Sequence, residues 1–315
     1  MFAKDVTLKQ HIPNMEGKSF LITGGSGKLA FAFSSAIKHY LRSASIEIPD
    51  RNDLNIEDLN SFKKYSKYRP DFILHCGARV NADFCETNLF EARQNIVEGT
   101  KNVVKFAIDS GAQLLYPQSF LIYDGQTDPV DEDTVPNPLS NYGKLKWEAE
   151  NVVAQNSNSL IIRMGGFFGG GERDTNFVGK FSIIIRSLLA DGISEIEVGS
   201  RVWQPTYTKD LAENSLLLMA LQKAGVYIMA GHKQATFFEV AKFIVLKLLL
   251  EEKIKVIEMA SDKSKLLDVA SRPMSINMIN KRLLSESLDF QRDWKVSLNE
   301  YLDSLEYKSV HPFEI

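Results

Sequence analysis

The sequence has 315 residues, with 37 Lys and Arg against 40 Asp and Glu, which gives a formal net charge of −3 at pH 7. A balance this close to neutral argues against a protein that binds nucleic acid or an anionic membrane through bulk charge. With 44% hydrophobic and 24% charged residues, the composition excludes a disordered chain and suggests about two domains, or one domain with an added lobe.

Strands and helices alternate along the first half of the sequence. Short apolar runs predict buried strands, and apolar residues spaced three or four apart predict amphipathic helices. The expected strands are 19–23, 45–48, 72–75, 113–117 and 160–164. The expected helices are 28–41, 56–68, 88–110 and 140–156. This alternation is typical of βαβ units, so we predict an α/β fold with a Rossmann-like, doubly wound parallel sheet.

The pattern changes after Met164, where a glycine-dense loop covers residues 165–171. Further helices are expected at 176–191, 208–223 and 236–251. We therefore predict an NAD(P)-binding domain over 1–164. A smaller C-terminal lobe over 165–315 would mainly bind substrate, with part of it returning to the first domain. Residues 1–17 are expected to form an extension ahead of the fold.

The cysteine content and the apolar runs indicate in which cellular compartment the protein lies. Cys76 and Cys85 are too few for a disulfide framework and favour a reducing compartment. The first twenty residues lack the apolar centre of a signal peptide, and the apolar run 243–250 is too short to span a bilayer. We expect a cytoplasmic protein with no membrane or nucleic-acid partner. The five histidines and two cysteines show no metal-ligand spacing, so no metal site is predicted.

A glycine turn lies between the first strand and the first helix. Gly24 and Gly27 would permit a tight turn and let the backbone approach a pyrophosphate, which the free N–H groups of the helix would bind. Beyond the second strand, Asp50 could hold a ribose 2′-hydroxyl and Arg51 could accommodate a 2′-phosphate. Arg51 favours NADP(H) over NAD(H). An ordinary turn with solvated loop charges is the alternative interpretation.

A second group of residues suggests proton transfer. Tyr142 and Lys146 lie one turn apart on a predicted helix, and a neighbouring ammonium should lower the pKa of the phenol. Tyr142 could then protonate a carbonyl oxygen as hydride reaches its carbon. Ser119, just past the strand 113–117, could hydrogen-bond the same oxygen. The alternative is that Ser119 is a turn serine and Tyr142 an aromatic residue at a helix end.

These motifs resemble the extended short-chain dehydrogenases/reductases, and further matches point to their dTDP-4-dehydrorhamnose reductase branch. The further matches are Arg51–Asn55, 70–78, Asp83, Glu86, Asn95, 122–125, 137–139, Glu150, Arg163, 176–177, 205–207, 210–212, 272–273 and Ser275. The resemblance runs from about residue 18 to residue 300.

The resemblance implies an NAD(P)H-dependent reductase of a keto nucleotide sugar, with a 4-keto-6-deoxy sugar expected, in polysaccharide or glycoconjugate precursor synthesis. It gives proton donation to Tyr142, orientation of the carbonyl to Ser119, and nicotinamide ribose binding to Lys146. The implied cofactor-binding residues are Gly24, Ser26, Gly27, Lys28, Leu29, Arg51, Gly77, Ala78, Tyr142, Lys146 and Gly165. The implied substrate contacts are Arg79, Phe120, Phe168, Asn176, Arg201 and Trp203. Homodimers are common in the family, so the resemblance is compatible with a homodimer of this chain.

Three departures from the family pattern lie where the family contacts the sugar. Phe120-Leu121 replaces Asp-Tyr, Gly165-Gly166 replaces a segment with Trp, and Ser200-Arg201 replaces Asp-Gln. The departures therefore favour a keto sugar other than the rhamnose precursor, and the sequence does not identify which one. Two other functions also stay open: an epimerase or dehydratase of the same superfamily that retains its cofactor, and a non-catalytic regulatory or binding protein on this scaffold.

Overall fold

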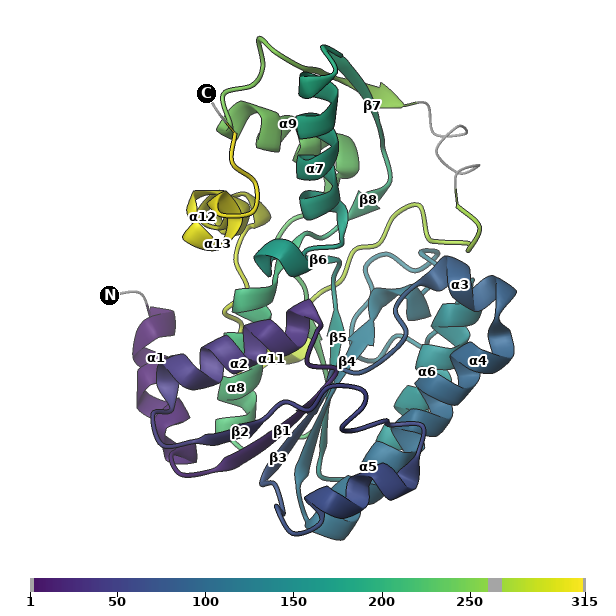
Figure 1. The fold of residues 1–315 in the computed structure, drawn as a ribbon, viewed down its shortest axis with the longest axis vertical. Helices are drawn as coiled ribbons and strands as arrows, with labels where there is room; N and C mark the ends of the chain where they lie inside the picture. The colour runs from purple at the N-terminus through teal and green to yellow at the C-terminus, as the bar shows by residue number, and fades with distance from the viewer. Residues whose placement is uncertain (1–2, 260–267, 314–315) are drawn as a thin grey trace.

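A six-stranded parallel sheet forms the centre of the structure, a computed structural model that describes residues 3–259 and 268–313 (Figure 1). The strands lie in the order β10-β5-β4-β3-β1-β2. They are β1 (Ser19–Thr23), β2 (Ser45–Glu47), β3 (Phe72–His75), β4 (Gln113–Ser119), β5 (Ser159–Met164) and β10 (Gly225–Met229). The order reverses at β1, which has β2 on one side and β3 on the other. This confirms the predicted doubly wound sheet and places a ligand crevice at the carboxyl ends of β1 and β3.

Helices cover both faces of this sheet (Figure 1). One face is covered by α2 (Lys28–Tyr40) and α8 (Thr208–Ala220), which pack against each other. The other face is covered by α3 (Ala82–Thr87), α4 (Leu89–Arg93), α5 (Gly99–Ser110) and α6 (Asn141–Val153). The predicted helix over 88–110 is interrupted by a π-helical turn at Gln94–Glu98. The predicted helix over 56–68 is a shorter 3-10 turn, Leu59–Tyr65.

The first residues belong to the fold, so the predicted N-terminal extension is wrong. The helix α1 (Ala3–His11) and the 3-10 turn Ile12–Met15 pack against α8. Leu8 and Ile12 have no exposed surface. Leu8, Ile12 and Met15 follow the i, i+4, i+7 spacing of a helix with one buried face, a signal that the sequence contained.

A second lobe lies above the carboxyl edge of the sheet (Figure 1). Its helices are α7 (Phe177–Ala190), α9 (Phe237–Lys247), α12 (Trp294–Asp303) and α13 (Leu305–Lys308). Its strands form the pairs β7 (Glu195–Gly199) with β12 (Lys255–Met259), and β8 (Val202–Trp203) with β11 (Ala235–Thr236). The chain enters this lobe through β6 (Phe167–Phe168), which pairs with β9 (Thr206–Tyr207). It then returns to the sheet through α8 and β10, beside which α11 (Lys281–Ser285) packs.

Candidate active site

The glycine turn lies at the point where the strand order reverses. Gly24 has φ +72°, and a Cβ on it would stand 2.6 Å from both Cα and N of Gly77, the residue that follows β3 by two positions. Gly27 caps α2 without a side chain, and its N–H donates to the carbonyl of Gly24 at 2.9 Å. The two chain segments therefore approach as closely as glycine allows. The first turn of α2 presents backbone N–H groups and the positive end of the helix dipole, an arrangement that suits a diphosphate.

The Lys28 side chain faces the second lobe rather than the glycine turn. Its Nζ lies 2.8 Å from Oδ1 of Asp174 and 5.4 Å from the ring centroid of Phe167, and both charged side chains are buried. Burial lowers the pKa of Lys28, while the Asp174 carboxylate opposes that shift. Lys28 can therefore line a pyrophosphate only through its backbone. Asp174 also accepts from the N–H of Gly169 at 3.0 Å, so it joins the glycine loop to α2.

The two residues expected to select the cofactor lie on an exposed loop after β2. The carboxylate of Asp50 accepts from the backbone N–H groups of Asn52 at 2.7 Å and Asp53 at 2.9 Å. It therefore caps its own turn. The Arg51 side chain is two-thirds exposed, and its Nη2 lies 2.9 Å from Oε1 of Glu57.

Ser119, Tyr142 and Lys146 come together at the carboxyl edge of the sheet. Ser119 is the last residue of β4, and the other two lie on the first two turns of α6. A Cβ on Gly143 would stand 2.3 Å from the carbonyl oxygen of Leu121. The missing side chain thus lets α6 approach the segment that follows β4. This approach places the phenol of Tyr142 beside Ser119, whose hydroxyl acts to lower the pKa of that phenol.

Burial controls the protonation of this group. It raises the pKa of Tyr142 well above its ordinary value, and the neighbouring Ser119 hydroxyl only partly opposes that rise. The expectation that Lys146 lowers this pKa is wrong here. Lys146 donates from Nζ to the carbonyl of Pro117 at 2.9 Å and lies 4.0 Å from the ring centroid of Tyr116. Burial lowers the pKa of Lys146 to about 7.

Of the predicted substrate contacts, two aromatic side chains are packed inside the second lobe. Phe168 has no exposed surface and stacks on Tyr207 with ring centroids 5.3 Å apart, so no part of its side chain can contact a substrate. That expectation is wrong, because the β6–β9 pair directs it into the core. Trp203 is also buried and stacks on Phe237 at 5.0 Å. A Cβ on Gly166 would stand 2.4 Å from its ring, which accounts for the glycine.

The remaining predicted substrate contacts are less enclosed. Phe120 follows Ser119 in a 3-10 turn and is half-buried. The amide of Asn176 donates to the carbonyl of Phe167 at 2.8 Å at the start of α7. The guanidinium of Arg79 lies 4.4 Å from the ring centroid of Phe84.

An ion-pair network that the sequence reasoning missed joins the two lobes. Arg272 pairs with Asp83 of α3 at 2.9 Å and with Asp268 at 2.7 Å, and Asp268 also pairs with Arg201. Arg201 is thus held by a carboxylate. Asp83 and Arg272 were noticed only as family matches, because their contact spans 189 residues of sequence.

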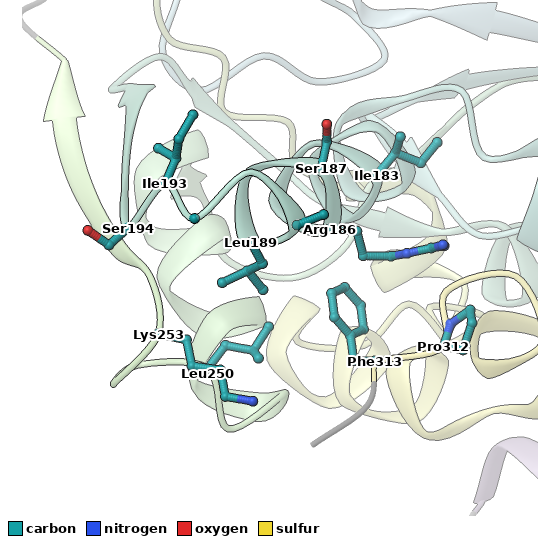
Figure 2. A pocket seen from close by; sticks show the side chains of 12 residues that line it. Ile183, Arg186, Ser187, Leu189, Ile193, Ser194, Leu250, Lys253, Pro312 and Phe313 are labelled. Atoms are coloured by element: carbon teal, nitrogen blue, oxygen red, sulfur yellow. The ribbon is translucent and has the colours of Figure 1, made fainter.

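Two cavities open away from this group of residues. One, of about 910 Å³, lies on the second lobe beside α7, where Leu189, Leu250 and Phe313 line it (Figure 2). The other, of about 1110 Å³, lies between α2 and α12 and is lined by charged side chains that include Lys4, Arg292 and Glu300. Neither includes Ser119, Tyr142, Lys146 or the glycine turn, so the geometry of these residues locates the candidate site.

Within residues 3–259 and 268–313, no three His, Cys, Asp or Glu side chains are grouped to hold a metal ion. Among the helices of those same ranges, none is long and apolar enough to cross a membrane.

Comparisons with known proteins agree with the geometry. The family model described as the RmlD substrate binding domain matches residues 18–307. Among curated proteins, the chain is 31% identical to methionine adenosyltransferase 2 subunit beta of Xenopus tropicalis over 252 residues, 74% of this chain and 73% of that one. It is 26% identical to dTDP-4-keto-6-deoxy-D-glucose reductase of Streptomyces niveus over 230 residues, 71% of this chain and 76% of that one.

Solved structures give the same family. A dTDP-4-dehydrorhamnose reductase from Clostridium acetobutylicum is 27% identical, with a TM-score of 0.82 over 90% of this chain and 98% of that one. A dTDP-4-dehydrorhamnose reductase from Bacillus anthracis in complex with NADP, 23% identical, shares the fold with a TM-score of 0.80 over 90% and 98% of the two chains. The predicted resemblance is therefore confirmed: the chain belongs to the RmlD substrate binding domain family of the extended short-chain dehydrogenases/reductases.

Proposed function

We propose that this protein is an NAD(P)H-dependent reductase of a keto nucleotide sugar. The observation that supports it best is the meeting of Ser119, Tyr142 and Lys146 beside a glycine turn at the carboxyl edge of a doubly wound sheet. When bound, the nicotinamide would supply the hydride that reduces the sugar carbonyl to an alcohol. The names of the reductases to which the chain is similar support the same reaction.

The residues of the chain have separate tasks in this reaction. Tyr142 is protonated at neutral pH, since the ordinary pKa of a phenol is near 10 and burial raises it further, so it holds the proton that the carbonyl oxygen receives. Ser119 hydrogen-bonds the same oxygen and orients it. Lys146 would bind the nicotinamide ribose. The close backbone approach at Gly24 and Gly77 leaves room for the diphosphate at the N-terminus of α2.

Several finer points are part of the proposal. The exposed guanidinium of Arg51 at the end of β2 favours NADP(H) through its attraction to a 2′-phosphate. Residues 165–315 would mainly bind the sugar nucleotide. The half-buried Asn176 and Arg201 from this lobe, with the half-buried Arg79 and Phe120 from residues 1–164, are the proposed contacts. A 4-keto-6-deoxy sugar is the proposed substrate. We further propose a cytoplasmic location and a homodimer.

The proposal is tested with a panel of 4-keto-6-deoxy nucleotide sugars and either NADPH or NADH. Absorbance at 340 nm should fall in proportion to product, and NADPH should be preferred. Replacing Arg51 by alanine should weaken NADPH binding about 10-fold, because one charge contact with a phosphate is worth on the order of 1–2 kcal/mol. NADH binding should stay the same. Sugar isomerisation with a retained dinucleotide would instead identify an epimerase.

A second candidate function rests on one observation from the comparisons. The chain is 31% identical to a protein named as a subunit of methionine adenosyltransferase, so a regulatory role in a complex with such an enzyme is the alternative. Size-exclusion chromatography of the chain mixed with a methionine adenosyltransferase catalytic subunit tests it. A stable complex, together with no consumption of NADPH across the sugar panel, would favour the regulatory role over the reductase.

A further inference from the structure

Gln118 connects the two elements that carry the candidate catalytic residues. It lies directly before Ser119 in β4 and has no exposed surface. Its Oε1 accepts from the backbone N–H of Ser119 at 2.8 Å. Its Nε2 donates to the carbonyl of Lys146 at 2.9 Å and to Oε2 of Glu150 at 2.8 Å. One buried amide therefore fixes the end of β4 against the turn of α6 that holds Lys146.

Glu150 is fixed in turn from the neighbouring strand. Its Oε1 pairs with Nη2 of Arg163 in β5 at 2.6 Å, and both side chains are buried. The Nη1 of Arg163 donates to the phenol oxygen of Tyr123 at 2.8 Å and to the carbonyl of Glu132 at 3.2 Å. Arg163 on β5 donates to both carboxylate oxygens, and Oε2 also accepts from Gln118 on β4, so the carboxylate is held from two strands one turn beyond Lys146.

We propose that Gln118 and Glu150 are positioning residues for the reductase site. Gln118 holds Ser119 and the Lys146 turn in register, and the carboxylate of Glu150, one turn further along α6, holds the Gln118 amide in place. The inference rests on the proposed function, because it concerns how these two groups meet cofactor and substrate. Neither residue faces the reacting atoms, so both act through Ser119 and Lys146.

Glu150 also acts on the charge of Lys146. Among the described residues, the groups that interact electrostatically with the Lys146 amine include His75 of β3, Cys76 just after it, the Tyr116 ring of β4, and Glu150 of the same helix. Burial lowers the pKa of His75 to about 3 and raises that of Cys76 to about 12, so both are neutral at pH 7. Glu150 is the group that raises the pKa of Lys146 most, against burial.

The first test compares two glutamines of the same strand. Gln118→Met removes the amide that touches the site. Gln113→Met, at the other end of β4, removes a buried amide that donates to the carbonyl of Lys223 at 2.9 Å. We expect similar losses of thermal stability in the two variants. Only Gln118→Met should weaken NADPH binding, about 10-fold or more, because the hydrogen bonds that position Ser119 and the Lys146 turn are lost. Equal NADPH affinity in the two variants would overturn the role of Gln118.

The second test measures NADPH affinity by fluorescence titration from pH 5.5 to 9. Protonated Lys146 should bind the anionic cofactor better, so wild-type affinity should fall as pH rises through about 7. Glu150→Gln should move this fall to lower pH by about one unit, because a favourable charge is lost and Arg163 is left unpaired. An unmoved midpoint in folded Glu150→Gln would overturn the inference alone. Absence of NADPH binding by the wild type at every pH would overturn the proposed function as well.

Discussion

Replacing Tyr142 by phenylalanine is expected to lower turnover about 1,000-fold while changing NADPH affinity by less than a few-fold. A positioned general acid contributes on the order of 10²–10⁴ to rate, and 1,000-fold corresponds to about 4 kcal/mol of barrier. The phenol is the group that holds a proton next to Ser119, and its raised pKa keeps that proton in place at neutral pH. Phenylalanine retains the ring and the packing, so the variant should fold and bind cofactor.

A second buried tyrosine supplies the matched control. Tyr227 lies on the outer strand β10, and its hydroxyl donates to Glu286 at about 3.1 Å. Tyr227→Phe therefore removes a buried phenol of the same kind without touching the site, and turnover should stay at the wild-type level. If Tyr142→Phe keeps more than a third of wild-type turnover in the same assay, Tyr142 does not donate the proton.

The sheet and the family could be predicted from sequence because both depend on local patterns. Short strand-like runs of four or five residues, separated by segments with helical spacing, predict the five strands from β1 to β5 and their order along the chain. The sixth strand, β10, was not predicted. It begins at Gly225, and 60 residues separate it from β5, a stretch (165–224) that includes both the second-lobe segment before α8 and α8 itself. No local sequence pattern predicts that this strand pairs with β5.

The candidate site was predicted in its residue types but not in its electrostatics. The spacing of Tyr142 and Lys146 indicates a shared helix face, which the structure has. It does not indicate that Lys146 turns to Pro117, nor that burial outweighs any neighbouring charge at Tyr142. Both effects depend on how deeply α6 is packed against β4. That depth is set by Gly143, whose missing side chain admits Leu121.

Long-range polar contacts were the part that the sequence concealed. Lys28 stands where family members approach a pyrophosphate, yet its partner Asp174 lies 146 residues away. Gln118 is one residue from Ser119, but the sequence does not predict a role for it, because a single glutamine in an apolar strand produces no periodic pattern. The role of this buried amide follows only from its three hydrogen-bond partners, which the structure shows.

Gly24→Ala is expected to lower the free energy of unfolding by about 2–4 kcal/mol and to abolish measurable NADPH binding. An alanine in the left-handed region costs about 1 kcal/mol, and a methyl group forced into packed backbone costs about 1–3 kcal/mol more. The new Cβ would stand 2.6 Å from Cα and N of Gly77, so the ends of β1 and β3 would have to separate. This separation would distort the glycine turn at the N-terminus of α2, where the diphosphate is proposed to bind.

Gly111→Ala separates the two contributions to this effect. Gly111 ends α5 with φ +74°, close to the +72° of Gly24, but a Cβ on it would meet nothing within 4 Å. We expect a loss of only about 1 kcal/mol in chemical denaturation and unchanged NADPH affinity. The difference between the two variants therefore measures the close approach to Gly77 alone. If Gly24→Ala behaved like Gly111→Ala in both measurements, that approach would not be what shapes the cofactor site.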